Sequence, residues 1–221
     1  MSAKPKYGPV REIGIGNRGV SGVFPGFGRY ESTLERDLME ILRFDPEVEH
    51  VDPQPVVVPY VDRQGKEGEY TPDGLIHFKT ELGPSFVPVL YEVKYRDDFR
   101  ENWKTLIPKF RGARDFARRE GWRFAVYTEN EIRTPYLENA RFLWRFKHRS
   151  PAGPIRQHVL RVLWDLEEAD PDLLLCALCN DPDNRAEMIP VLWHLVATGA
   201  IGCDLNLPLN MRTPIWAEVQ V

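Results

Sequence analysis

Apolar positions recur along the chain with two different periods, which predicts a mixture of helices and strands. A helical stripe of Leu34, Leu38 and Leu42 ends at Phe44-Asp45-Pro46, whereas later segments alternate apolar and polar residues or are rich in β-branched and aromatic residues. We expect helices at about 32–44, 101–120, 135–148, 155–168, 171–179 and 184–198, and strands at about 48–51, 55–61, 70–78, 87–95 and 122–128. Strands joined by helices after a hairpin predict an α/β fold with a mixed central sheet flanked by helices.

Two breaks in this pattern predict the domain organisation. Residues 1–29 are basic and Gly-rich with little periodicity, and Ser-Pro-Ala-Gly-Pro at 150–154 separates two regular regions. We therefore expect an N-terminal arm at 1–29, an α/β domain at 30–149 and a C-terminal module at 150–221. Three helices followed by a short hairpin are the pattern of a small winged-helix-like module, although Pro190 must be accommodated in the third helix.

Composition excludes several classes of protein. With 43% hydrophobic and 28% charged residues, the chain can bury a core and is neither disordered nor collagen-like. No apolar run approaches the roughly 18 residues of a membrane span, and the N-terminus lacks the apolar region of a secretory signal. We therefore expect no membrane partner. Three cysteines do not make a disulfide framework, so we expect a reducing, cytoplasmic location.

Charge is unevenly distributed along the chain, although the net charge is only −4. Residues 94–123 carry ten Lys/Arg against five Asp/Glu, 141–161 carry six basic residues and no acidic ones, and 165–187 carry eight acidic residues against Arg185 alone. One face could follow the phosphates of DNA, and the alternative is that these are simply solvated helix faces. The candidate DNA contacts are Arg18, Arg29, Lys104, Lys109, Arg111 and Arg114.

The candidate chemistry lies between residues 69 and 95. Asp73 in Thr-Pro-Asp falls on one expected strand, and Glu92 and Lys94, two residues apart, share one face of the next. Two carboxylates on neighbouring strands can share a hard divalent metal, and a lysine beside them can orient water or offset charge on a phosphate. Proline-aspartate, eighteen residues and then E-x-K is the arrangement of the PD-(D/E)xK nucleases. The alternative is a turn aspartate beside a solvated stripe.

Two further polar residues allow two interpretations each. Ser32-Thr33-Leu34-Glu35 fits a capping box, in which Glu35 reaches back to the helix start. Glu35 could instead point at the metal site as an additional carboxylate. Gln54, in Asp-Pro-Gln-Pro, is either a site residue or, as we favour, a hydrogen-bonding residue at a strand end.

An ordered series of short motifs resembles the TnsA family of transposon-end endonucleases over roughly residues 20–148. The motifs are Tyr-Glu-Ser-Thr-Leu-Glu-Arg-Asp at 30–37, Phe-Asp-Pro at 44–46, Gln-Pro at 54–55, Tyr-Thr-Pro-Asp at 70–73 and Glu-Val-Lys at 92–94. The resemblance implies a restriction-endonuclease-like fold and a catalytic role for Glu35, Asp73 and Lys94. Glu92 occupies a position that is glutamine in some members.

The resemblance also implies a division of labour. Members of the family nick the 5′ ends of the transposon, a separate DDE-type transposase acts at the 3′ ends, and an AAA+ regulator contacts the C-terminal domain. On this reading Glu35, Asp73 and Glu92, with the Val93 carbonyl, would hold Mg²⁺, for which Mn²⁺ could substitute, and Lys94 would act beside them. The alternatives are a restriction or repair nuclease of the same superfamily and a non-catalytic subunit that scaffolds a DNA complex.

Overall fold

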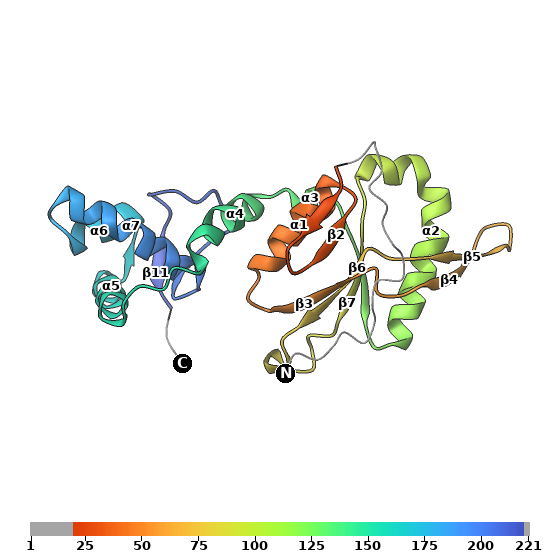
Figure 1. Ribbon diagram of the computed structural model, residues 1–221, viewed down its shortest axis with the longest axis horizontal. Helices are drawn as coiled ribbons and strands as arrows, with labels where there is room; N and C mark the ends of the chain where they lie inside the picture. Colours follow the sequence, from red (N-terminus) through yellow and green to blue (C-terminus); the bar gives the residue numbers. More distant parts are fainter. Residues whose placement is uncertain (1–19, 219–221) are drawn as a thin grey trace. The chain divides into compact units, whose positions relative to one another are not determined.

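A computed structural model describes residues 20–218 of the chain, which forms two compact units that divide between Arg133 and Thr134 (Figure 1). Unit 1 contains the candidate chemistry, and unit 2 contains the C-terminal helices. Within the described residues, no helix combines the length and the apolar character that a bilayer crossing requires.

A four-stranded mixed sheet forms the centre of unit 1, as the sequence predicts. Its strands are ordered β3-β6-β7-β8, with antiparallel pairing between the first three and parallel pairing between β7 and β8. The bounds are β3 (Val48–Pro53), β6 (Gly74–Phe78), β7 (Val89–Val93) and β8 (Arg123–Tyr127). Every residue of β7 is buried, because helices cover both faces of the sheet.

The two faces of the sheet bury separate apolar clusters. On one face Tyr91 and Val93 pack with the leucines of α1 (Thr33–Phe44) and with Ile132 of α3 (Glu129–Ile132). On the other, Leu75 and Leu90 pack against Phe110 and the alanines of α2 (Arg96–Arg119), which runs along that side in Figure 1. The alternation along β7 therefore sends Glu92 toward the α2 side, opposite to its neighbours Tyr91 and Val93.

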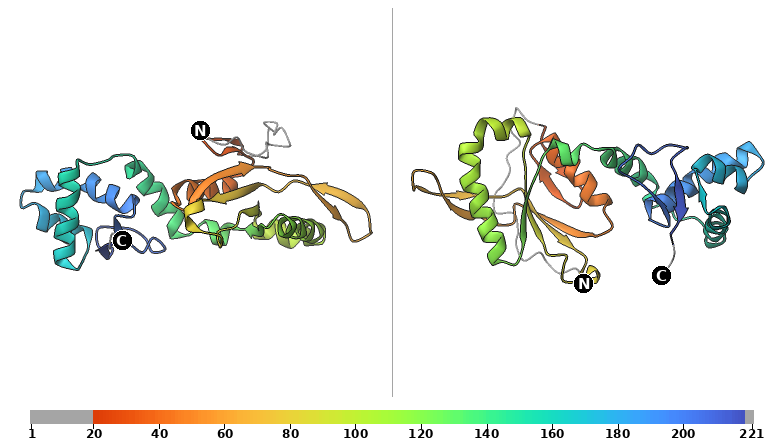
Figure 2. Two further views of the ribbon diagram at one scale, coloured as in Figure 1. Left: turned by 90° about the horizontal axis from the view of Figure 1, so that it is seen from below. Right: turned by 180° about the vertical axis from the view of Figure 1, so that it is seen from behind.

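Two hairpins accompany the sheet. One joins β1 (Gly22–Phe24) to β2 (Gly28–Tyr30), so residues 22–29 are ordered secondary structure rather than the continuation of an irregular arm. The other joins β4 (Val58–Val61) to β5 (Glu67–Tyr70) and extends away from the central sheet (Figures 1 and 2). A short 3₁₀ turn, η1 (Thr80–Leu82), lies between β6 and β7.

Two elements differ from the sequence prediction. The expected strand 70–78 is two strands, because Pro72 has no N–H for a ladder and the chain changes partner there: β5 pairs with β4, and β6 pairs with β3 and β7. The helix expected at 101–120 begins at Arg96 and continues through Pro108 without interruption. Proline removes one backbone hydrogen bond, and the buried face of α2 compensates for that loss.

Unit 1 ends at a residue with several partners. The Arg133 guanidinium donates through Nε to Asp37 Oδ2 (3.0 Å) and through Nη2 to Thr33 Oγ1 (3.0 Å) and Tyr95 Oη (3.1 Å). The chain therefore leaves unit 1 from a point bonded to α1 and to the start of α2.

Unit 2, as far as the structure describes it, contains four helices and a three-stranded antiparallel sheet of order β10-β11-β9. In chain order the elements are α4 (Pro135–Lys147), α5 (Gly153–Leu166), β9 (Glu168–Ala169), α6 (Pro171–Leu178), α7 (Pro182–Ala197), β10 (Ile201–Cys203) and β11 (Ile215–Ala217). The sequence predicts the domain boundary near residue 150, whereas the structure groups α4 with unit 2. Helix α4 packs against α7, where the Phe142 ring meets the Trp193 ring edge to face.

Asn139 of α4 fixes the long loop between β10 and β11. Its buried side-chain amide donates to the carbonyls of Leu205 (2.8 Å) and Leu207 (2.7 Å) and accepts from the Leu209 N–H (3.1 Å). Three backbone groups of one loop are thus satisfied by a single side chain, which explains why α4 belongs to this unit.

Candidate active site

The register of β6 and β7 places Asp73 directly opposite Glu92. Gly74 pairs with Tyr91 in this antiparallel ladder, so the residue before β6 faces the residue after Tyr91. Directly opposed side chains have Cβ atoms about 5 Å apart and share a face. Lys94 follows the last residue of β7, so the three predicted residues meet at the end of the sheet where β6 begins and β7 ends.

Glu92 is a buried carboxylate with both oxygens engaged. Its side chain is 5% exposed; Oε1 lies 2.9 Å from the Lys94 ammonium, and Oε2 accepts from the Tyr70 hydroxyl at 2.6 Å. Burial, followed by the charge of Glu92, raises the pKa of Tyr70, so this hydroxyl stays protonated and remains a donor. Tyr70 is a site residue that the sequence did not single out, although it stands three positions before Asp73.

Asp73 carries the least compensated charge of the site. Its Oδ2 accepts from the Val93 N–H at 2.7 Å, and its other oxygen has no hydrogen-bond partner among the described residues. Burial raises the pKa of Asp73 well above its ordinary value, the charges of Glu92 and Glu35 add to the effect, and Lys94 and the Val93 N–H oppose it. These charge effects place Glu92, Glu35 and Lys94 near Asp73. Val93, predicted as a carbonyl ligand, contributes its N–H to Asp73.

Lys94 remains a cation despite its partial burial. Burial alone would lower the pKa of Lys94, but Glu92, Asp73 and Glu35 together outweigh burial and raise it. The ammonium group is therefore held charged, 2.9 Å from Glu92 Oε1.

Glu35 makes the capping interaction that the sequence allows, and its role as a metal-site carboxylate stays a prediction. Its Oε2 accepts from the Glu31 N–H (2.9 Å), its Oε1 accepts from the Ser32 hydroxyl (2.9 Å), and its own N–H donates to Ser32 Oγ (3.1 Å). This is a capping interaction at the start of α1. Burial also raises the pKa of Glu35, while Lys94 lowers it, so the same carboxylate lies within the field of the site.

Comparison with known families bears on this arrangement. Residues 45–129 match the family described as TnsA-like endonuclease N terminal. The resemblance inferred from the short motifs is therefore confirmed for this segment, which contains Asp73, Glu92 and Lys94. No curated protein matches the chain.

The matched TnsA-like segment leaves part of the site outside it. Glu35 and α1 precede it, and unit 2 follows it. The catalytic role of Glu35 thus rests on the resemblance of the motif at 30–37 and on its electrostatic contact with Asp73 and Lys94.

Gln54 lies across from Asp73 in the TnsA-like segment. Its N–H donates to the Asp73 carbonyl at 3.0 Å, so the favoured interpretation as a hydrogen-bonding residue at a strand end describes its backbone. Two features go beyond that interpretation: its φ of +46° is in the region that favours glycine, and its side-chain Oε1 is buried without a partner in the described part of the chain. Both features belong to Gln54, whose backbone is bonded to that of the candidate catalytic residue Asp73. Backbone strain often accompanies functional sites.

Basic residues of α2 line a cavity of about 570 Å³ beside Lys94. Arg111 and Arg114, two of the predicted DNA contacts, line this cavity together with Arg96 and Arg100. The other candidates are placed elsewhere: Lys104 lies over the Trp103 ring, Lys109 lies over the Tyr60 ring, and Arg29 is on β2. Arg18 lies outside the described residues.

The carboxylates of the TnsA-like site are not drawn tightly together. Within residues 20–218, the three potential metal-ligand atoms that lie within 4.8 Å of one another belong to His50, Asp52 and His77. In the same range Glu35, Asp73 and Glu92 form no such group, and each has at least one oxygen bonded to a donor of the protein. The histidine group lies further along the β3–β6 pair and was not anticipated from the sequence.

Proposed function

We propose that the protein is a metal-dependent endodeoxyribonuclease that cleaves at the 5′ ends of a transposon as one subunit of a heteromeric transposase. The observation that carries this proposal is the meeting of Asp73, Glu92 and Lys94 at one end of the sheet, within residues that match TnsA-like endonucleases. No other part of the proposal has equal weight.

The donor set fits a hard divalent cation. Asp73 is a carboxylate whose charge is opposed by burial and by two neighbouring carboxylates, and one of its oxygens has no hydrogen-bond partner among residues 20–218. A cation held by Glu35, Asp73 and Glu92, with the Val93 carbonyl, would neutralise that repulsion. Oxygen ligands favour Mg²⁺, and Mn²⁺ accepts the same set. When bound, such an ion polarises a phosphodiester and lowers the pKa of a bound water.

The remaining residues position these groups. Tyr70 and Lys94 hold the two oxygens of Glu92, and the Val93 N–H fixes one oxygen of Asp73. Lys94 supplies a positive charge that can stabilise the negative charge developing on the scissile phosphate. The basic cavity along α2 gives a DNA backbone a route to the same place, because Arg111 and Arg114 share its lining with Lys94.

We further propose that unit 2 is a winged-helix-like module that docks on other transposition proteins. The order α5, β9, α6, α7, β10, β11 supports the winged-helix interpretation, with strand β9 completing the sheet of the final hairpin. Its acidic segment 165–187 disfavours phosphate contact. Trp164 and Leu173, which are 60% and 50% exposed, supply apolar area suited to protein partners. The partners proposed are a DDE-type transposase and an AAA+ regulator.

The deciding experiment is a strand-resolved cleavage assay on DNA carrying the transposon ends. We expect Mg²⁺-dependent nicking at the 5′ ends when the neighbouring transposition proteins are present, and weak, salt-sensitive, sequence-independent DNA binding by the purified chain alone. Asp73→Asn and Lys94→Gln should each abolish nicking.

Other outcomes would select the alternatives. Tight, sequence-specific cleavage by the chain alone would indicate a restriction or repair nuclease. Cleavage of the same ends by complexes that contain the Asp73→Asn and Lys94→Gln double variant would indicate a scaffold without its own chemistry.

A further inference from the structure

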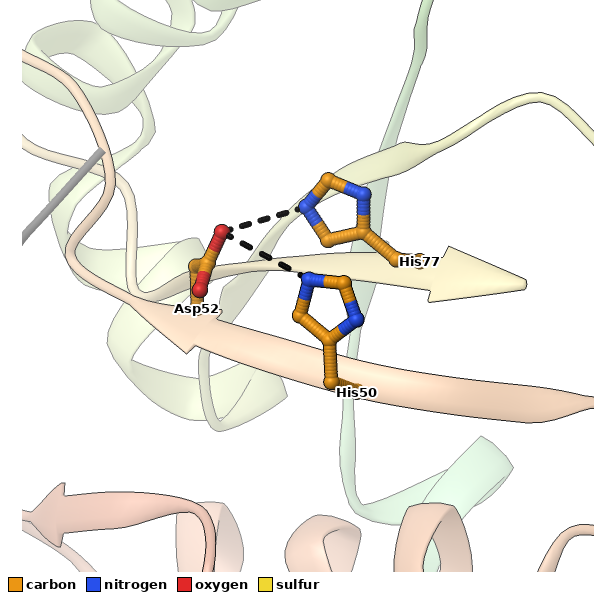
Figure 3. A group of neighbouring side chains, drawn as sticks. All are labelled: His50, Asp52 and His77. Carbon is orange, nitrogen blue, oxygen red and sulfur yellow. Dashed lines mark hydrogen bonds and ion pairs between the residues drawn. The ribbon is translucent and has the colours of Figure 1, made fainter. Parts of the chain in front are cut away.

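Three side chains on β3 and β6 converge on one point (Figure 3). Asp52 Oδ2 lies 3.2 Å from His77 Nε2 and 4.0 Å from His50 Nε2. The two imidazole rings stack with their centroids 4.2 Å apart and their planes 10° from parallel. Both rings thus present the same nitrogen toward the same carboxylate oxygen.

An irregularity in β3 brings His50 to this place. His50 pairs with His77 and Val51 with Ile76, but Val48 pairs with Phe78, so Glu49 is an extra residue in β3. Val48 and Phe78 pack on the α1 side of the sheet. Without the extra residue, His50 would share the face of Val48, two positions away. The bulge instead aims His50 at the opposite face, where His77 and Asp52 lie.

The Asp52 carboxylate has the two imidazoles as its polar partners. Asp52 is 6% exposed, and in the described part of the chain its Oδ2 has His77 at hydrogen-bond distance and His50 at 4.0 Å. A carboxylate offers about four acceptor positions, and a neutral imidazole fills one. The Asp52 oxygens therefore keep acceptor positions that a cation at this point could use.

We propose that His50, Asp52 and His77 form a binding site for a divalent first-row transition metal, with Zn²⁺ as the best fit. Two imidazole nitrogens and one carboxylate oxygen are ligands typical of Zn²⁺, whereas Mg²⁺ prefers oxygen alone. Ligands of a tetrahedral zinc ion are about 3.4 Å apart, close to the 3.2 Å and 4.0 Å separations here. The side chain of His50 is 46% exposed, which leaves a path for the ion and room for water as a fourth ligand.

Because the His50 and His77 rings are nearly parallel, metal binding requires one of them to rotate. A metal lies in the plane of each imidazole that binds it, and two stacked planes cannot both contain one ion. His50 is the more exposed ring, at 46% against 24% for His77, so it is the ring that turns.

This site is separate from the proposed nuclease centre and does not depend on it. Asp73 precedes the first residue of β6, whereas His77 is the fourth residue of that strand. An ion here would link the edge strand β3 to β6. Because β6 begins directly after Asp73, the ion would also restrain the strand next to that residue.

The test uses the full chain, freed of metal with a chelator, in the Asp73→Asn background so that the carboxylate centre does not compete. Zn²⁺ is titrated by calorimetry, and Co²⁺ is titrated as an optical probe. We expect one equivalent of Zn²⁺ to bind, and a visible Co²⁺ absorption without the near-ultraviolet thiolate band that cysteine ligands give. His77→Gln and Asp52→Asn should each weaken Zn²⁺ binding at least about tenfold, and His158→Gln, an exposed histidine elsewhere, should not.

Thermal melts without metal establish that each variant folds, and melts with Zn²⁺ give a second measure of binding. His50→Gln provides a further variant at an exposed position. Absence of Zn²⁺ binding by the folded Asp73→Asn protein would overturn the proposal. So would Zn²⁺ binding that survives His50→Gln and His77→Gln together, and either result would leave the three residues as a hydrogen-bonded group only.

Discussion

The Asp73 carboxylate is held by one backbone N–H while burial and two neighbouring carboxylates oppose its charge. Its pKa is therefore higher in the folded protein than in the unfolded chain. Between these two pKa values the folded state binds more protons, so the free energy of unfolding falls as pH rises through that interval. Above the ordinary pKa of an aspartate and without metal, Asp73 therefore lowers the free energy of unfolding.

Asp73→Asn removes this charge and keeps an oxygen that can accept from Val93. We expect the metal-free variant to be more stable than the parent at pH 7 by on the order of 1 kcal/mol, a rise in Tm of roughly 2–4 °C. The difference should shrink as pH is lowered toward about 4, because the parent then becomes protonated. Melting curves of both proteins across this pH range in chelator measure it, and equal stability at all pH values would contradict it.

Glu35 can be tested by a change that separates charge from hydrogen bonding. Glu35→Gln keeps an acceptor for the Glu31 N–H or the Ser32 hydroxyl but removes the charge that Asp73 and Lys94 experience. We expect cleavage to be lost while the free energy of unfolding changes by less than about 1 kcal/mol.

The matched control is Ser32→Ala, which removes the acceptor for the Glu35 N–H and one donor to the Glu35 carboxylate but keeps the carboxylate itself. It should cost about 0.5–2 kcal/mol of stability and leave cleavage measurable. Normal cleavage by Glu35→Gln would reduce Glu35 to a helix cap.

At this scale the sequence predicted the charged residues of the candidate site but not the side chains that hydrogen-bond to them. Strand alternation placed Glu92 and Lys94 on one face, and the β6–β7 register places Asp73 opposite Glu92. Tyr70 could not be found in that way, because it belongs to a different hairpin and reaches Glu92 only through the fold. The group of His50, Asp52 and His77 could not be predicted for a similar reason, because the pairing of His50 with His77 depends on one extra residue in β3.

Among the elements, α2 lies unusually close to the β4–β5 hairpin. A side chain added at Gly112 would place its Cβ 2.9 Å from the Pro59 carbonyl oxygen and 3.0 Å from Tyr60 Cβ. The first of these is backbone and cannot turn away. The absence of a side chain at residue 112 therefore permits the hairpin that carries Tyr70 to pack on α2.

Gly112→Ala should destabilise the protein by about 1 kcal/mol. Overpacking costs roughly 1–3 kcal/mol, and the better helix propensity of alanine returns up to about 1 kcal/mol. Gly153→Ala at the start of α5 is the control, because a Cβ there meets nothing within 4 Å and should cause no loss. Denaturant unfolding of the two variants measures the difference, and equal midpoints would show that the hairpin can shift without cost.

Local pattern predicted which elements exist better than it predicted where they begin and end. All four strands of the central sheet and the helices of unit 2 were expected close to their observed bounds. The split at Pro72 and the early start of α2 were not, because each depends on which partner the backbone meets. Pro108 lies inside α2, and the buried residues of that helix keep it continuous.

For the whole molecule, the division at Arg133 rather than near residue 150 has a measurable consequence. Leu137, Ala140 and Leu143 of α4 are buried, and α4 packs on α7 and holds the loop after β10. A fragment of residues 1–133 should be soluble and melt cooperatively, whereas 1–150 should expose the apolar face of α4, bind a hydrophobic dye and associate. Size-exclusion chromatography and dye fluorescence compare the two, and a well-behaved 1–150 fragment would place the boundary where the sequence put it.

Arg133 ends unit 1 at a junction where unit 2 could be replaced by another module. Because its guanidinium is bonded to Asp37, Thr33 and Tyr95, the last residue of unit 1 is fastened by contacts that involve no residue of unit 2. A protein engineer who joined a different module at Thr134 would leave those three anchors unchanged. If the proposed function holds, the same junction gives evolution a place at which one nuclease core could be recombined with different docking modules.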